Sequence, residues 1–311
     1  NRDINEMNDE ATCTDDSVGG LAGDSITGGM GTLGTDDASA FGSGISNNII
    51  ASYRQAISIM TDKTSVNTNL LAIPGIRDPF VTDHAADKNR DYQMAMYIMD
   101  IPSYDEDGNR LFINSTAKPD TGKTSEELDS RVFDNNYAAT YFPDVFITDP
   151  INNKRVLVPS SIAAIGAIGY SDSVSYPWYA PAGFNRGGLQ FVENVKVRLN
   201  AADRDDLYER RINPIATFPN SGFVIFGQKT LQYAQSALDR VNVRRLLLEV
   251  KRQTIEVANL ILFEQNTPQT RQRFINLVAP RLALIQAQAG IESFKVVMDD
   301  SNNTEEDREN N

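Results

Sequence analysis

The sequence has little of the side-chain chemistry on which most enzymes and metal proteins depend. It contains one cysteine, Cys13, and one histidine, His84, among 311 residues. A single cysteine cannot form an internal disulfide, and a single histidine cannot build a metal site from several imidazoles. No run of about 18 apolar residues occurs, so we expect no membrane-spanning helix. The chain starts at Asn1 without a basic-then-apolar leader, so we expect no secretory signal and a processed piece of a longer protein.

The net charge of −13 is concentrated at the two ends of the chain. Residues 1–40 contain nine acidic residues and one arginine, and residues 299–311 contain six acidic residues and one arginine. The span between them is neutral overall, with +6 over 186–281 and −6 over 41–185. A neutral body is poorly suited to binding nucleic acid, whereas oppositely charged halves suit head-to-tail binding between copies of the chain. Ordinary scatter of surface charge explains the pattern equally well.

Hydrophobic patterns predict an α/β (α+β) fold, a mixed β-sheet flanked by helices with two long C-terminal helices. Apolar or alternating runs predict strands at 69–73, 93–101, 138–148, 154–158, 190–199 and 293–298, with a hairpin within 213–227. Helical spacing predicts helices from Ser46, over 79–91, from Ser160 and over 239–259. A last helix should start after Thr267, bend at Pro280 and end at Gly290.

Composition divides the chain into three regions. Residues 1–44 are acidic and rich in glycine, 45–298 form the core domain, and 299–311 form an acidic tail that we expect to be disordered. Within the core, 102–136 is a polar insertion for which we predict a hairpin and a short helix at 124–134.

Short motifs in the sequence resemble functional loops but lack the residues that those loops need. Residues 117–124 fit a loose phosphate-loop pattern, yet the first glycine is Ala117 and Pro119 removes a backbone donor. Residues 105–109 begin like a calcium loop without its glycine or closing glutamate, so a turn is the better interpretation. We therefore predict no catalytic residue, metal or cofactor. A hydrolase or nucleotide-binding enzyme using His84 or Lys123 is kept as an alternative.

Two further segments could bind a partner. The aromatic loop 176–188 could stack on a sugar, which keeps a glycan- or receptor-binding module as another alternative, but its prolines and glycines favour a structural corner. The helix at 239–259 carries basic residues that could contact an acidic partner, although such a face is usually only solvated: Arg240, Arg244, Arg245, Lys251 and Arg252.

The order of several segments resembles the tail sheath proteins of contractile-tailed bacteriophages. The loop from Pro177 to Gly183 resembles a Trp-x-Ala-Pro-Ala motif of that family, and Asn213-Pro214-Ile215 resembles the start of its hairpin. Seven stretches carry the resemblance in order: 66–75, 137–161, 177–183, 212–227, 241–247, 262–266 and 300–304. The N-terminal arm and the closing C-terminal strand of the family have no counterpart here, and 102–136 is longer than expected.

The resemblance implies a structural rather than an enzymatic function. A sheath subunit assembles helically around a tail tube, and the sheath contracts to drive genome delivery. The implied partners are copies of the chain itself, the tail tube protein, and baseplate and tail terminator proteins, with no nucleic acid and no membrane insertion. The implied location is the virion tail, with the host cytoplasm during assembly. Under this interpretation the five basic residues of 239–259 would contact the tube or a neighbouring subunit.

Overall fold

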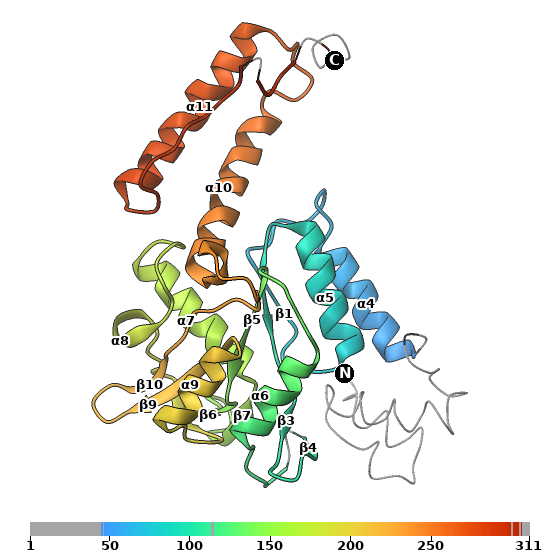
Figure 1. Cartoon of the computed structure of the whole chain (residues 1–311), viewed down its shortest axis with the longest axis vertical. Helices are drawn as coiled ribbons and strands as arrows, with labels where there is room; N and C mark the ends of the chain where they lie inside the picture. The colour runs from blue at the N-terminus through green and yellow to red at the C-terminus, as the bar shows by residue number, and fades with distance from the viewer. Residues whose placement is uncertain (1–44, 46, 113–114, 300, 305, 307–311) are drawn as a thin grey trace.

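The computed structural model describes residues 45, 47–112, 115–299, 301–304 and 306 (Figure 1). The predicted N-terminal segment 1–44 and most of the predicted tail lie outside the described residues. The central sheet has the order β1 (Leu70–Ala72), β2 (Met96–Met99), β5 (Ala138–Phe142), β9 (Ile212–Phe218) and β10 (Gly222–Ile225). The first four strands are parallel and β10 is antiparallel to β9, which confirms the predicted mixed sheet.

Alternating side chains of β2 divide the core into two layers. Tyr97 and Met99 pack in one hydrophobic cluster, which includes side chains from α4 (Asn48–Met60), α5 (Pro79–Tyr92), α6 (Thr121–Ser130) and α9 (Ala201–Glu209). Met96 and Ile98 pack in the other, with side chains from α7 (Ser160–Val174) and α10 (Val241–Asn259). Because successive strand residues point to opposite faces, both faces of the sheet are covered, as parallel strands require.

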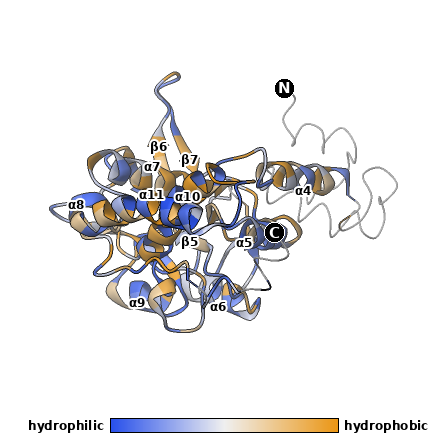
Figure 2. Cartoon of the chain, turned by 90° about the horizontal axis from the view of Figure 1, so that it is seen from above, coloured by the Kyte–Doolittle hydropathy of each residue, from blue (hydrophilic) through white to orange (hydrophobic). Residues whose placement is uncertain are grey.

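The predicted strand at 138–148 is in fact two strands in different sheets. β5 ends before Pro143, and β6 (Val145–Thr148) lies in the middle of a second sheet, between β7 (Arg155–Val158) and β8 (Val192–Val195). Proline has no N–H to continue the first ladder, which explains the break. Seen from above in Figure 2, the β6–β7 hairpin extends from one side of the molecule.

Helix starts differ from the prediction where a neighbouring side chain caps the helix better. α4 starts after Asn47 rather than Ser46, because the Asn47 side chain accepts a hydrogen bond from the Ile49 N–H at 2.9 Å. In the polar insertion, β3 (Ser103–Tyr104) and β4 (Arg110–Leu111) form the predicted hairpin. α6 starts earlier than predicted, since the Asp120 carboxylate accepts from the Lys123 N–H at 2.7 Å.

The two long C-terminal helices form an arm that projects from the body (Figure 1). A short 3₁₀ helix (Ala237–Asp239) precedes α10, and α11 (Pro268–Ala287) follows the predicted Thr267 cap and contains Pro280. No strand forms at 293–298. This segment runs back along α11 (Figure 1), and a helix offers no free backbone groups with which a strand could pair. None of the described helices has both the length and the apolar character needed to cross a membrane.

Candidate functional site

The residues of the two motifs that resemble functional loops make their hydrogen bonds and ion pairs within the chain. Lys123 lies in the first turn of α6, and its backbone N–H is held by Asp120, the residue that caps the helix. Its ammonium lies 3.3 Å from the Glu126 carboxylate. In the β3–β4 turn, the Asp105 carboxylate accepts from the Asn109 N–H at 2.7 Å, which is the geometry of a turn. No group of metal-binding side chains occurs among the described residues.

His84 lies on α5 near Arg54, Lys88 and Asp87. Partial burial lowers the pKa of His84, and the nearby Arg54 and Lys88 lower it further. A histidine that stays neutral in this way could accept a proton, but no hydrogen bond from a serine to this imidazole is recorded in the described part of the chain. The alternative of a hydrolase that uses His84 therefore gains no support from the geometry.

A cluster of buried polar side chains, which the sequence analysis missed, lies where β2 and β5 end. Arg77 donates to both carboxylate oxygens of Asp144, at 2.8 and 2.7 Å. Asp100 accepts from the Gly75 N–H at 2.9 Å and from the Ser161 hydroxyl at 2.7 Å. We call five side chains the buried ionic cluster: Arg77, Asp100, Asp144, Ser160 and Ser161.

The buried ionic cluster joins elements rather than performing chemistry. Serine beside aspartate suggests a nucleophile, but the Ser160 hydroxyl donates to the Tyr141 carbonyl at 2.7 Å and every member is at most 5% exposed. Burial raises the pKa of Asp100, while the charge of Arg77 opposes this rise. The cluster ties the start of α7 to the loops after β1, β2 and β5.

The aromatic loop forms the structural corner that its composition favours. Tyr176 and Trp178 stack with ring centroids 5.0 Å apart, and the Trp178 indole N–H donates to the Gln288 carbonyl at 3.1 Å. Trp178 also packs with Leu246 of α10 and Ile285 of α11. The loop therefore anchors the C-terminal arm to the body. We call Trp178, Leu246 and Ile285 the arm anchor.

Most of the predicted basic face of α10 is engaged within the chain. Arg244 and Arg245 are buried: Arg244 donates to the Asn136 carbonyl and lies 4.0 Å from the Tyr137 ring, and Arg245 pairs with Asp172. Burial lowers the pKa of Arg244. These arginines hold α10 against α7 and the segment that leads into β5. Helical spacing in the sequence predicts that the two arginines lie close together on the helix. It cannot show that other elements of the fold cover this face.

The other three basic residues are only partly buried. Lys251 donates to the Gln93 side chain at 2.7 Å, and Arg252 donates to the Met94 carbonyl at 3.1 Å and pairs with Glu249 at 2.9 Å. Arg240 pairs with Asp239 at 3.0 Å and donates to the Tyr208 hydroxyl. Their contact with a tube or a neighbouring subunit stays a prediction.

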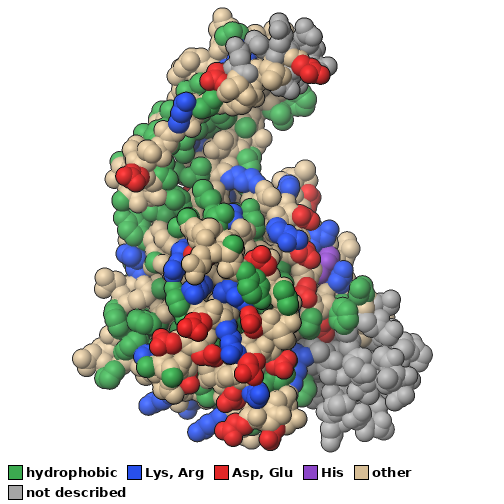
Figure 3. All heavy atoms as spheres, in the orientation of Figure 1, with side chains coloured by type: hydrophobic (Ala, Val, Ile, Leu, Met, Phe, Trp, Pro, Cys, Tyr) green, Lys and Arg blue, Asp and Glu red, His purple; other side chains and the backbone are tan. Residues whose placement is uncertain are grey.

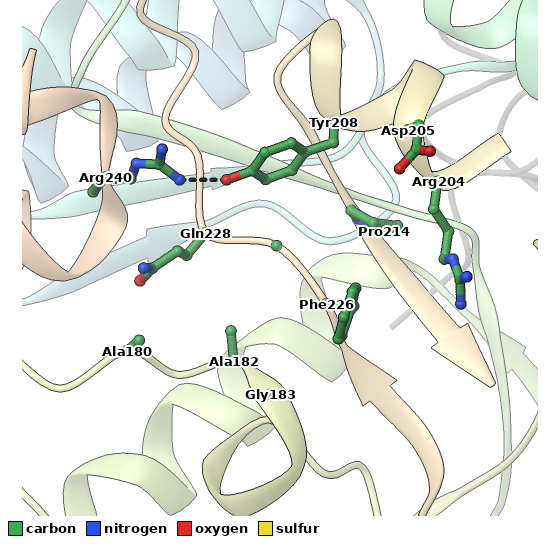
Figure 4. A pocket seen from close by; sticks show the side chains of 11 residues that line it. Ala180, Ala182, Gly183, Arg204, Asp205, Tyr208, Pro214, Phe226, Gln228 and Arg240 are labelled. Carbon is green, nitrogen blue, oxygen red and sulfur yellow. Dashed lines mark hydrogen bonds between the residues drawn. The ribbon is translucent and has the colours of Figure 1, made fainter. Parts of the chain in front are cut away.

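A pocket of about 450 Å³ opens between α8 (Gly183–Arg186), α9 and the segment that follows β10. Its lining combines apolar groups with two arginines and one acid: Ala180, Ala182, Gly183, Arg204, Asp205, Tyr208, Pro214, Phe226, Gly227, Gln228 and Arg240. In the view of Figure 4, Tyr208 lies between Arg240 and Arg204, and Phe226 lies below them. Phe184 and Phe218 pack beside Phe226. We call this the aromatic pocket, and sequence patterns gave no sign of it because its residues come from distant segments.

Comparisons with known proteins were made for sequence and for fold. No family model matches the sequence. A tail sheath protein of Vibrio phage KVP40 is 40% identical over 172 residues, covering 55% of this chain and 25% of the relative. The tail sheath protein of Enterobacteria phage T4 is 35% identical over 168 residues, covering 54% of this chain and 26% of the relative. The chain thus matches about a quarter of the length of these curated relatives.

The fold is similar to that of chains in contractile assemblies. A chain in the baseplate structure of the anti-feeding prophage has a TM-score of 0.62 at 20% identity, over 83% of this chain and 65% of that chain. A chain in the contracted helical sheath of the same prophage has a TM-score of 0.56 at 21% identity, over 80% and 61%. Identities this low show a shared fold only. Together, the sequence matches and the shared fold confirm the resemblance to contractile tail sheath proteins, over part of the length of those proteins.

Proposed function

We propose that this chain is the core of a structural subunit of a contractile phage tail sheath. The observation that carries the proposal is the 35–40% identity to two phage tail sheath proteins, together with a fold like that of a contracted helical sheath. In this role the subunit assembles helically with copies of itself around a tail tube, and contraction of the sheath drives genome delivery. The function is mechanical and not enzymatic.

The internal construction supports such a role. A subunit that moves as a rigid body must transmit force without deforming, and close-packed interiors resist deformation. Helices cover both faces of the central sheet, the buried ionic cluster joins four segments of chain, and the arm anchor fixes the projecting helices. Force applied to the arm would therefore be passed to the sheet.

The proposed partners follow from the same role. Copies of the chain and baseplate proteins are supported by the folds found in a helical sheath and in a baseplate. The tail tube and the tail terminator are finer proposals that rest on the implied function. We place the protein in the virion tail, and in the host cytoplasm during assembly. The division into 1–44, 45–298 with its insertion 102–136, and 299–311 is likewise kept as a proposal.

Electron microscopy of the protein expressed from its complete reading frame, with and without the phage tube protein, tests the function. We expect hollow helical sleeves that enclose tubes when tubes are present. Uniform monomers at all protein and salt concentrations would contradict the proposal.

The proposed contact between α10 and the tube needs a variant that leaves the fold intact. Reversal of Arg244 or Arg245 should weaken assembly, but it would also break buried contacts within the subunit. Lys251→Gln removes one charge and keeps a group that can donate to Gln93. We expect it to lower the yield of tube-filled sleeves, whereas the control Lys154→Gln, in the exposed β6–β7 turn, should not. Equal yields from the two variants would contradict the contact.

A further inference from the structure

The loop between α10 and α11 presents an unusual apolar tip. Leu260 and Leu262 are exposed, and Phe263 is completely exposed at 100%. Phe263 also has a positive φ of 66°, which is uncommon for a bulky residue and costs backbone energy. Glu264 follows and is exposed beside Arg273, 3.5 Å away. We call residues 260–264 the arm tip.

The aromatic pocket offers an exposed aromatic ring and a positive charge, which complement the apolar side chains and the Glu264 carboxylate of the arm tip. Phe226 lines the pocket and is 45% exposed, so an apolar group entering the pocket would cover its ring. The Arg204 guanidinium lies 5.2 Å from the Phe218 ring and 5.8 Å from the Phe226 ring, and it has no carboxylate partner within the described ranges. The volume of about 450 Å³ lies in the range of roughly 300–1,000 Å³ that is typical of ligand pockets.

The two surfaces lie toward opposite ends of the molecule. In Figure 1 the arm tip is at the upper end of the longest axis, whereas α8, α9 and β10 lie in the lower part of the body. Figure 3, in the same orientation, shows the arm curving away from the body above a hollow. The arm tip therefore cannot enter the pocket of its own chain. A contact between different patches on identical chains does not close on itself by a two-fold axis, and it builds rings or helical filaments.

We propose that the arm tip of one copy inserts Phe263 into the aromatic pocket of the next copy, with Glu264 facing Arg204. This inference deepens the proposed sheath function and rests on it for the second copy as occupant. Charge favours the pairing, because the pocket presents Arg204 and Arg240 against the single acid Asp205. Arg240 is already paired with Asp239, so Arg204 is the cation left to meet Glu264, which would exchange its exposed contact with Arg273 for this one.

Disulfide trapping between copies tests the geometry. In a Cys13→Ser background, one protein carries Phe263→Cys and another carries Ala182→Cys, in the pocket lining. Mild oxidation of the mixture should give a covalent dimer that neither protein gives alone. A control pair combines Ala182→Cys with Ile151→Cys, an equally accessible position in the β6–β7 turn. A dimer yield no higher than that of the control pair would overturn the proposal.

Sedimentation of the same chain tests the energetics. Loss of the buried ring in Phe263→Ala should raise the dissociation constant between copies by about tenfold or more, while Ile151→Ala should leave it unchanged. Glu264→Arg should weaken association by several-fold, and mixing it with Arg204→Glu should recover part of the loss. An unchanged dissociation constant for Phe263→Ala would contradict the contact, and the exposure of this ring makes loss of folding an inadequate explanation.

The two claims fail in different ways. A trapped dimer from copies that never form helical sleeves supports the contact and counts against the sheath function. Sleeves that form normally with Phe263→Ala, and that give no trapped dimer, overturn the contact and leave the sheath function standing.

Discussion

Single residues matter most in this chain where charge is buried. Arg77 and Asp144 lie far apart in sequence and meet in the core, where Arg77 makes two hydrogen bonds to the carboxylate. A buried pair with good geometry is costly to break, because the remaining charge is left without a partner. The buried ionic cluster could not be predicted from the sequence: nothing near Arg77 or Asp144 indicates which distant residue each will meet.

Replacing Arg77 by leucine should lower the free energy of unfolding by about 3–5 kcal/mol, because Asp144 would remain buried and unpaired. The matched control is Arg90→Leu. It breaks the Arg90–Asp87 pair, in which both side chains are more than half exposed, and should change the free energy by less than about 1 kcal/mol. Urea denaturation of both variants measures the difference. Similar losses in the two variants would mean that the buried pair is not a stabilising element.

The pKa shift of Asp100 predicts a pH effect. Burial raises the pKa of Asp100 above its usual value of 3.8, so the folded state holds this proton to higher pH than the unfolded state. Stability from this residue is therefore fully present below about pH 3.8 and is lost as the pH rises through the folded pKa. The Asp100→Asn variant does not lose stability in this way, because its side-chain amide does not ionise. Its free energy of unfolding, relative to the parent, should increase between pH 4 and pH 7, and a constant difference across this range would contradict the expectation.

Helices with clear sequence signals were predicted at nearly the right positions, and elements with weak signals were not. α10 was predicted closely because its apolar stripe is long, and α11 because Thr267–Pro268 marks a helix start. α9 was missed because only Leu207 is buried in it, and its one local signal is the capping box of Asn200 and Asp203. The segment 293–298 has the pattern of a strand, but strand formation depends on a free sheet edge, which no local pattern reports.

The local stability of the C-terminal arm depends on the arm anchor. Trp178→Ala would remove a buried ring from between α10 and α11 and should lower the free energy of unfolding by about 3–5 kcal/mol. Hydrogen exchange should increase first in the C-terminal end of α11, where Ile285 and the Gln288 carbonyl lose their partner. Tyr170→Ala, at a half-exposed ring on α7, serves as the control. Exchange that rises uniformly over the whole chain would show that the arm is not held locally by Trp178.

For the whole molecule, composition and segment order indicated the class of protein but not its working surfaces. Scarcity of cysteine and histidine, and a neutral body, argued against an enzyme or a nucleic-acid binder before any fold was known. The predicted basic face instead holds α10 on the body through Arg244 and Arg245, and the aromatic pocket is assembled from segments that only the fold brings together. Surfaces for assembly are tertiary features, and local sequence patterns specify them poorly.

The most direct test of the central claim is electron microscopy of the protein from its complete reading frame, mixed with phage tail tubes. We expect helical sleeves around the tubes, in which each repeating unit has this sheet with its projecting two-helix arm. Tubes that stay bare in the presence of folded, monomeric protein would contradict the sheath function.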